Sequence, residues 1–398
     1  MTIPKIKIGD VAKINPRPSR VPQLDEMVSF AGMTDLSAER GCITQSALRP
    51  FAEVCKGYTP FHAQDILVAK ITPCFENCKI GEASIPTDIG YGSTEFHVIR
   101  PLPARLDRRY LLHFLRQARI LKTGERRMTG SAGQRRVPAS FLEALEIPLP
   151  PLEEQRRIAA ILDKVARIDE LCGAARELSQ AAEKSLFLHF FADQQEGDGR
   201  LLKELADSRP NAIRTGPFGS QLLHSEFTDS GIAVLGIDNA VNNCFEWGRK
   251  RFISNKKYAQ LKRYTVSPGD LLITIMGTCG RAVVVPDDIP LAINTKHLCA
   301  VSVDRRVVLP EFLHSYMLFH PSASRYLAQR TKGAIMEGLN MAIIKEMPVN
   351  VPPISQQLDW LKRREIVKSV GRGAQAMTAS ASSLSLSLSC NLLAGRIA

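Results

Sequence analysis

The feature that most constrains this chain is a cluster of prolines followed by a long helical pattern. Pro148, Pro150 and Pro151 cannot lie inside a helix, but proline is favoured at a helix start, so a helix is predicted to begin near Leu152. Apolar residues then recur at steps of three and four as far as Phe191, the spacing of a narrow coiled-coil seam. About 40 helical residues span roughly 60 Å, so this helix needs a partner helix.

The partner is predicted at the other end of the chain. Residues 352–357 repeat the form of residues 150–155 at a distance of 202 residues, and residues 312–317 match residues 110–115 at the same distance. A period near 200 residues is too long for a solenoid repeat. The sequence therefore predicts a duplicated unit, each copy consisting of a globular lobe and a long helix.

Inside the lobes, short apolar runs predict strands, and only residues 107–121 of the first lobe show a helical pattern. The predicted fold class is α+β: two mainly β globular lobes with small helical flanks, joined by two long helices packed as an antiparallel coiled coil, with a pseudo-twofold internal repeat. The predicted divisions are 1–150 for the first lobe, 151–200 for the first helix, 201–350 for the second lobe and 351–398 for the second helix.

The helix–helix seam is predicted from the apolar residues at these steps. It comprises Ile158, Ile161, Val165, Ile168, Cys172 and Ala175 on the first helix and Val367, Val370, Ala374, Met377, Leu384 and Leu388 on the second. Gly371 and Gly373 each cost roughly 1 kcal/mol in a helix interior. We therefore expect the second helix to be frayed or kinked.

Composition bounds the class of protein. The chain has 398 residues, enough for two or three domains, no run of 18 apolar residues and no apolar signal core near Met1, so we expect a cytoplasmic protein without a membrane contact. Its nine cysteines lack disulfide-like spacing and fit reduced thiols. Cys74 and Cys78, with His62 or His97, are a weak zinc candidate, because structural zinc usually needs four ligands in tighter pairs; no metal site is predicted.

The net charge of +12 is unevenly distributed. The excess of Lys and Arg over Asp and Glu is +6 in residues 1–150, −3 in 151–200, +5 in 201–350 and +4 in 351–398. Two basic lobes indicate a polyanion that contacts both. The alternative is that the basic residues only keep the surface soluble.

Two basic stretches are the best candidates for contacts with nucleic acid. Residues 126–136 combine arginines with glycines and hydroxyl groups, and residues 245–264 alternate basic with aromatic side chains. The alternatives are a solvated loop for the first and an amphipathic core segment for the second. The predicted DNA-binding residues are Lys70, Lys79, Arg126, Arg127, Thr129, Ser131, Gln134, Arg135, Arg136, Arg249, Lys250, Arg251, Lys256, Lys257, Arg281, Lys296 and Lys332.

Motifs for chemistry are missing from the sequence. We find no Asn/Asp-Pro-Pro-Tyr/Phe motif of an amino-methyltransferase, no phosphate-binding loop, and no Pro-Asp with a Glu-x-Lys partner as in nucleases; Pro286-Asp287-Asp288 comes nearest. His97 and His297 lie near predicted strands and are expected to be core or groove residues rather than bases. The prediction is a binding subunit without catalysis of its own.

Four segments carry a resemblance to a known family. They are I-P-L-P-P-L-E-E-Q-R-R-I from Ile147, G-P-F-G-S from Gly216, the strand and glycine turn of residues 269–282, and residues 71–83 of the first lobe. With them, the chain resembles the specificity subunits of type I restriction-modification systems, which have two target-recognition domains and two spacer helices. The second helix departs from the pattern, with Ser355-Gln356 where the first has Glu153-Glu154.

The resemblance implies a function for each part. Each lobe would read one half of a bipartite, asymmetric sequence in double-stranded DNA, the helices would set the spacing, and two methyltransferase (modification) subunits would dock around them, with restriction subunits in the full complex. The subunit itself would use no cofactor; S-adenosylmethionine, ATP and Mg would serve its partners. The alternatives are a stand-alone DNA methyltransferase or nuclease with unrecognised motifs, and a structural scaffold without a DNA contact.

Overall fold

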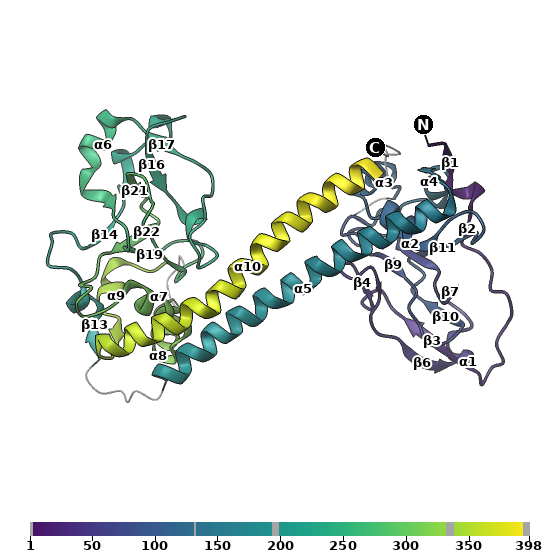
Figure 1. Cartoon of the computed structure of the whole chain (residues 1–398), viewed down its shortest axis with the longest axis horizontal. Coiled ribbons are helices and arrows are strands. Elements are labelled where there is room, and N and C mark those ends of the chain that lie inside the picture. The colour runs from purple at the N-terminus through teal and green to yellow at the C-terminus, as the bar shows by residue number, and fades with distance from the viewer. Residues whose placement is uncertain (1–2, 131–132, 193–198, 332–337, 393–398) are drawn as a thin grey trace. The chain divides into compact units, whose positions relative to one another are not determined.

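The computed structural model describes residues 3–130, 133–192, 199–331 and 338–392 (Figure 1). The chain divides into two compact units: unit 1 is residues 1–173 with 375–398, and unit 2 is residues 174–374. Both boundaries fall inside long helices, α5 (Leu152–Phe191) and α10 (Ile354–Leu392). Each unit combines β-sheets with helices, and each is described by itself below.

Unit 1 contains three sheets. A two-stranded sheet pairs β1 (Lys5–Lys7) with β12 (Glu146–Pro148). The four-stranded sheet has the order β6-β3-β10-β7, with bounds Ala47–Pro50, Met27–Ala31, Ile89–Gly92 and Thr59–His62. The six-stranded sheet has the order β2-β11-β8-β9-β5-β4, with bounds Ala12–Ile14, Phe96–Pro101, Ile66–Ala69, Ile80–Glu82, Cys42–Ile43 and Leu36–Ser37.

The helices of unit 1 flank these sheets. They are α1 (Phe51–Val54), α2 (Arg108–Leu115), α3 (Ala118–Arg127), α4 (Ala139–Ala144) and the first part of α5. The single helix predicted over residues 107–121 is therefore wrong: the backbone is extended at Gln117, and this residue separates α2 from α3. Asp107 caps α2 by accepting hydrogen bonds from the backbone N–H groups of Arg109 and Tyr110 at 2.9 and 3.0 Å.

Unit 2 also contains three sheets. A two-stranded sheet pairs β13 (Arg200–Leu201) with β23 (Pro348–Val349). The four-stranded sheet has the order β14-β22-β19-β20, with bounds Ile213–Thr215, Leu298–Val301, Leu271–Thr274 and Ala282–Val284. The five-stranded sheet has the order β15-β17-β16-β21-β18, with bounds Phe227–Thr228, Phe252–Ile253, Ile232–Leu235, Ala292–Asn294 and Thr265–Val266.

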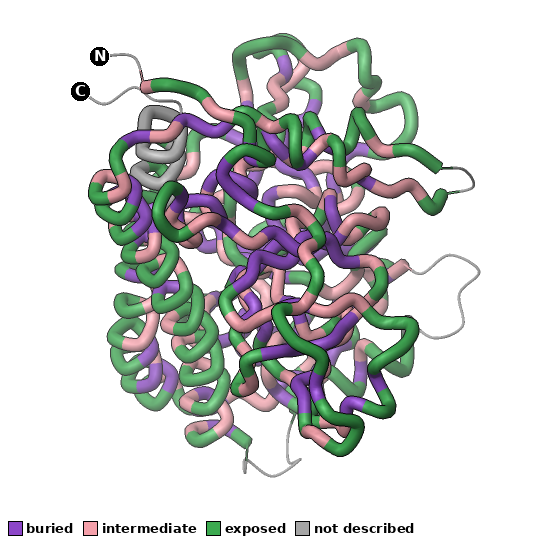
Figure 2. Tube along the Cα trace, turned by 90° about the vertical axis from the view of Figure 1, so that its right-hand side faces the viewer, coloured by how far each residue is buried: buried purple, intermediate pink, exposed green. Residues whose placement is uncertain are grey.

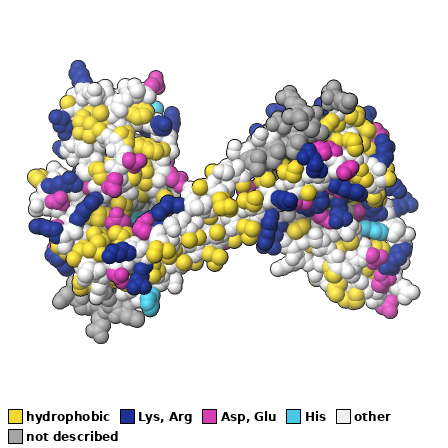
Figure 3. Space-filling view, viewed as in Figure 1, with side chains coloured by type: hydrophobic (Ala, Val, Ile, Leu, Met, Phe, Trp, Pro, Cys, Tyr) yellow, Lys and Arg dark blue, Asp and Glu magenta, His cyan; other side chains and the backbone are white. Residues whose placement is uncertain are grey.

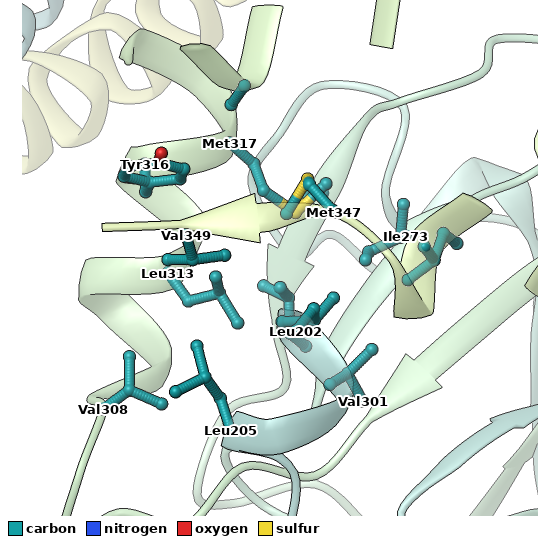
Figure 4. Close-up of a cluster of buried hydrophobic side chains, with 14 of the residues drawn as sticks. Leu202, Leu205, Ile273, Val301, Val308, Leu313, Tyr316, Met317, Met347 and Val349 are labelled. Atoms are coloured by element: carbon teal, nitrogen blue, oxygen red, sulfur yellow. The ribbon is translucent and has the colours of Figure 1, made fainter. Parts of the chain in front are cut away.

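Most helices of unit 2 enclose its largest core cluster, and α6 (Asn255–Leu261) packs on a smaller one. The others are α7 (Pro310–Phe319), α8 (Pro321–Thr331), α9 (Met341–Lys345) and the adjoining parts of α5 and α10. Side chains from β19, β22, α7 and the turn at Leu202 and Leu205 point toward one another in this core (Figure 4). In both units the strands at the sheet centres are buried and the connecting loops are mostly exposed (Figure 2).

A buried carboxylate begins the central strand of a sheet in each unit. Asp65, 3% exposed, accepts two hydrogen bonds from Arg100 at 2.8 and 2.7 Å. Asp270, 2% exposed, accepts a hydrogen bond from Arg214 at 2.5 Å and one from Ser302. A buried charge without a partner would be strongly destabilising, so these arginines fix the start of β8 and of β19.

A buried glutamine amide fixes the start of α5. The side chain of Gln155 is fully buried; its Oε1 accepts from the backbone N–H of Asp107 at 2.8 Å, and its Nε2 donates to the carbonyl oxygens of Arg105 at 3.0 Å and Pro150 at 2.9 Å. These bonds join the segment before α2 to the proline segment before α5. We refer to this arrangement as the glutamine clamp.

The same clamp occurs in unit 2. The fully buried Gln357 accepts from the backbone N–H of Leu309 at 2.8 Å and donates to the carbonyl oxygens of Val307 at 3.0 Å and Pro352 at 2.8 Å. The atoms and distances match those around Gln155. Both long helices therefore leave their lobes through the same three hydrogen bonds.

Within unit 2, α5 contacts α10 through a series of paired side chains. Phe187 packs on Trp360 with 5.6 Å between ring centroids, Glu183 forms a 2.5 Å ion pair with the buried Arg364, and the Ser179 hydroxyl donates to the Val367 carbonyl oxygen at 3.0 Å. The residue numbers rise along one helix as they fall along the other, so the paired segments run in opposite directions.

The frayed or kinked second helix expected from the glycines is wrong, because α10 is one continuous helix from Ile354 to Leu392. A Cβ atom at Gly371 would lie 2.8 Å from the Ser179 Oγ. Glycine at this position lets the two backbones approach closely, and that packing offsets its low helix propensity.

The predicted seam is partly wrong in register. On α10 the buried and half-buried positions include Trp360, Arg364, Val367, Gly371, Ala374 and Ala381, whereas Val370 and Met377 are 59% and 58% exposed. On α5, Ile158, Val165 and Cys172 are buried, Ile161 and Ala175 are half-buried, and Ile168 is 38% exposed. Small and polar residues occupy the buried positions that a selection by hydrophobicity misses. The predicted Leu384 and Leu388 have no described side chains.

Replacing the clamp residue Gln357 with Ala should destabilise unit 2 by about 3 kcal/mol, because three buried backbone groups lose their partner. Urea unfolding followed by tryptophan fluorescence measures this directly, since both tryptophans of the chain lie in unit 2. Lys362→Ala, an exposed position on the same helix, is the control and should change stability by less than about 0.5 kcal/mol. Equal effects of the two substitutions would mean that the clamp does not hold the helix.

Candidate nucleic-acid interface

In unit 1, the basic stretch of residues 126–136 begins in the last turn of α3 and continues beside the end of β8. Thr129 and Arg136 exchange backbone hydrogen bonds at 3.0 and 2.8 Å, and Arg136 also bridges to Ile71. The backbone N–H of Val137 donates to the backbone carbonyl oxygen of Lys70 at 2.9 Å. The fold thus brings two segments of the sequence prediction together, 70–72 and 129–136. The predicted Ser131 lies outside the described residues.

The arginines of this stretch differ in how their charge is balanced. Arg136 forms a 2.7 Å ion pair with Glu95, and its hydrogen bond holds the pKa of the Glu95 carboxyl below its usual range. Arg135 lies 3.8 Å from Glu76. Arg126 and Arg127 are exposed and contact no acidic side chain in the described part of the chain. The last two are therefore the most available to a phosphate.

The remaining predicted residues of unit 1 differ in whether their side chains are engaged by the protein or exposed to solvent. The Lys79 ammonium donates to the Met33 carbonyl oxygen at 2.6 Å and so holds a loop, while Lys70 is half-buried beside the 129–136 segment. Thr129 and Gln134 are exposed.

His97 is a satisfied core residue, as expected for a histidine next to a strand. One ring nitrogen lies 2.8 Å from the Val137 carbonyl oxygen and the other 3.1 Å from the Asn15 amide nitrogen. Burial lowers the pKa of His97. Neutral imidazole satisfies both contacts, donating to the carbonyl and accepting from the amide.

In unit 2, most of the predicted basic residues lie around β17 and α6, while Arg281 precedes β20 and Lys296 follows β21. Arg251 pairs with Asp238 at 2.9 Å, and Lys257 pairs with Glu226 at 2.7 Å. The other predicted residues carry no such ion pair in the described ranges, and all of them are exposed: Arg249, Lys250, Lys256, Arg281 and Lys296. The predicted Lys332 lies outside the described residues. On the face shown in Figure 3, Lys and Arg side chains are spread over each unit rather than gathered in one patch.

A cavity of about 280 Å³ adjoins this basic segment. Its aromatic lining residues, Trp247 and Phe252, were not among the predicted DNA-binding residues. Trp247, Phe252, Val234 and Pro290 line it together with Arg249 and Lys250. The alternation of basic and aromatic residues over 245–264 was the available signal. Asn239 and Pro290 come from other segments, so spacing within 245–264 could not reveal them.

No metal centre is formed by the described residues: they contain no group of three or more His, Cys, Asp or Glu side chains placed to hold an ion. Cys74 and Cys78 are both recorded as free thiols. Among the helices that the structure describes, none combines the length and apolarity needed to cross a membrane.

The first half of the chain matches a known protein family. Residues 3–177 match the family of type I restriction modification DNA specificity domains. The type I restriction enzyme EcoAI specificity subunit of Escherichia coli is 40% identical over 200 residues, which make up 50% of this chain and 32% of that protein. The EcoEI specificity subunit, also from Escherichia coli, is 38% identical over 205 residues, with 51% and 32% covered.

Solved structures show the same fold. The S subunit of a type I restriction-modification system from M. genitalium superimposes with a TM-score of 0.61 at 14% identity, covering 99% of this chain and 96% of that one. A chain from a study of assembly and conformational transition of the type I R-M system gives a TM-score of 0.54 at 15% identity, covering 100% and 98%. The chain spans about a third of the length of the two curated relatives.

Residues 3–177 are thus similar to a type I restriction modification DNA specificity domain, in agreement with the resemblance that the sequence motifs carry. The family and its curated members are named for specificity rather than for a catalysed reaction.

Replacing Arg126 and Arg127 together with Ala should weaken binding to duplex DNA and reduce the slope of log affinity against log salt by about 2, because each lost phosphate contact removes about 0.9. Fluorescence anisotropy over a salt series measures the slope. Arg136→Ala is the contrast, since its charge is already balanced by Glu95, and should change the slope by less than one unit. If the double substitution leaves the slope unaltered, the stretch is only a solvated loop.

Proposed function

We propose that this chain is the DNA-recognition subunit of a type I restriction-modification complex, in which each lobe binds one half of a bipartite, asymmetric DNA site. The observation that carries the proposal is that both units present exposed cations without an ion pair to a described acidic side chain: Arg126 and Arg127 in the last turn of α3 in unit 1, and Arg249 and Lys250 in the loop before β17 in unit 2. Such side chains bind phosphates, and the neighbouring loops can contact base edges. The family match to DNA specificity domains supports it.

The long helices have a separate role in this proposal. They pack as an antiparallel coiled coil related by a pseudo-twofold repeat, set the gap between half-sites and dock two methyltransferase subunits, with restriction subunits in the full complex. Support comes from the opposed pairing of α5 and α10 inside unit 2 and from apolar side chains that stay exposed on both helices, namely Leu171, Leu178, Ile366, Val370 and Met377. Exposed apolar patches of this kind are typical of protein interfaces.

The domain divisions at 150, 200 and 350 belong to the same proposal, as does the assignment of cofactors. The chain itself would catalyse no reaction in the cytoplasm, and its partners would use S-adenosylmethionine, ATP and Mg. The stand-alone methyltransferase or nuclease is the less favoured function, because the family and relatives are named for specificity.

Exchanging residues 201–350 for the corresponding lobe of a relative should change one half-site only, because each unit has its own core clusters. Mapping of methylated adenines in cells that carry the chimaera and its methyltransferase partner reads both half-sites and the gap. The unexchanged subunit is the control. A change in both half-sites would contradict independent reading.

Inserting four helical residues between Ala175 and Arg176 should widen the gap between half-sites by about one or two base pairs. The insertion adds about 6 Å of helix, against roughly 3.4 Å per base pair, and is absorbed as a stutter in the seam. The same methylation mapping gives the gap. A matched insertion in the loop at Asp287, outside the helices, should leave it unaltered. An active protein with the original gap would show that the helices do not set the spacing.

A further inference from the structure

The cavity beside Trp247 in unit 2 has a rigid aromatic wall. The Trp247 ring, 48% exposed, packs edge-on against Phe245 with 5.3 Å between centroids. The loop that carries it is held on both sides: the buried Asn239 amide donates to the Glu246 carbonyl oxygen at 2.8 Å, and the Asp238 carboxylate accepts from the backbone N–H of Arg249 at 2.7 Å. The ring is therefore positioned before any ligand binds.

The rim of the cavity is cationic. Asp238 also accepts a hydrogen bond from Arg251 at 2.9 Å, which fixes one guanidinium at the edge. Arg249 and Lys250 extend from the same loop, exposed, with no ion pair to any described acidic side chain. An aromatic face between cations suits a nucleobase with its neighbouring phosphates.

The size of the cavity selects the ligand. Its volume of about 280 Å³ is just below the range for drug-sized ligand sites, about 300–1,000 Å³. One base can be accommodated, and a larger cofactor would extend into solvent.

At the matching strand position of unit 1, the described aromatic side chains pack against each other. The position that corresponds to Val234 in unit 1 is Phe30. Phe30 lies on β3, which pairs in parallel with β10, and Val234 lies on β16, which pairs in parallel with β21. Tyr58 packs edge-on against the Phe30 ring at 4.9 Å, and the Arg49 guanidinium lies 4.2 Å from its centroid. The Tyr58 ring of unit 1 thus occupies a position that corresponds to the cavity beside Trp247 in unit 2. This difference suits two lobes that read different half-sites.

We propose that the Trp247 pocket holds a single nucleobase, unstacked from the DNA bound to unit 2, with its ring on Trp247 and the flanking phosphates on Arg249 and Lys250. The inference rests on the proposed function, since the base belongs to the bound DNA. The pocket makes unit 2 sensitive to how easily one base leaves the duplex, which adds selectivity beyond contacts to base edges.

The chain provides its own reporter for this site. It has two tryptophans, and Trp360 is fully buried among Phe187, Phe191 and Phe312. In full-length Trp360→Phe protein, fluorescence comes from Trp247 alone. A single-stranded deoxynucleotide of about eight residues, within the site sizes of stacking platforms, should quench it.

Substitutions separate stacking from charge. Trp247→Ala should weaken binding of the oligonucleotide by about fivefold to a hundredfold, the range for losing one stacked base, whereas Trp247→Phe should retain most of the affinity. Leu223→Ala removes an apolar side chain of matched exposure, 50%, that does not line the cavity, and should have no effect. Circular dichroism verifies that each variant is folded.

Duplex DNA with single mismatches, scanned across the half-site of unit 2, identifies the base. One mismatch position should bind more tightly than the matched duplex, because less pairing energy opposes extrusion, and Trp247→Ala should abolish the gain. Quenching by free dAMP or dTMP without quenching by the oligonucleotide would overturn the inference in favour of a free nucleotide. Normal duplex binding with no quenching by any probe would overturn it and leave the proposed function intact. Failure to bind any DNA would refute the proposed function itself.

Discussion

The glutamine clamp is the interaction on which the arrangement of each half of the chain depends. A single buried amide, Gln155 or Gln357, satisfies one N–H group and two carbonyl oxygens. These groups belong to the proline segment and to the segment before α2 or α7, and they would otherwise be buried without partners. Because an amide has both donors and an acceptor, no apolar side chain can replace it. The direction in which each long helix leaves its sheets is thereby fixed by hydrogen bonds rather than by hydrophobic contact alone.

A fixed framework leaves the loops of each unit free to differ. The buried carboxylates Asp65 and Asp270 and the two clamps have the same partners in kind, whereas the surfaces beside them diverge: Arg136 is neutralised by Glu95 in unit 1, and unit 2 has an open cavity beside Trp247. This is the division of labour that a protein reading two different half-sites requires, with specificity in loops supported by rigid strands.

Much of the framework was predictable because its signals are local. Prolines before Leu152 and Ile354 determine where the helices begin, and apolar runs after Asp65 and Asp270 mark buried strands. The binding surface was less predictable, because the partners of its charges are distant in sequence. Lys79 is engaged by Met33, 46 residues away, and Arg136 by Glu95, 41 residues away, so neither contact can be inferred from composition. The cavity beside Trp247 is likewise lined by Asn239 and Pro290, which come from other segments of the sequence.

The register of the helix seam is the most instructive error. Hydrophobicity selects Val370 and Met377, yet the segment that meets α5 inside unit 2 presents Trp360, Arg364, Val367 and Gly371. Close approach at Gly371 and a buried ion pair at Arg364 specify one alignment, because a shifted register would leave Arg364 buried without Glu183. Small and polar residues in the seam leave larger apolar side chains exposed, and Ile366 is 69% exposed. Hydrophobic side chains are visible along the surface of the long helices (Figure 3). A helix pair built in this way is held in register from within and leaves apolar side chains exposed, as the proposed docking of a methyltransferase subunit requires.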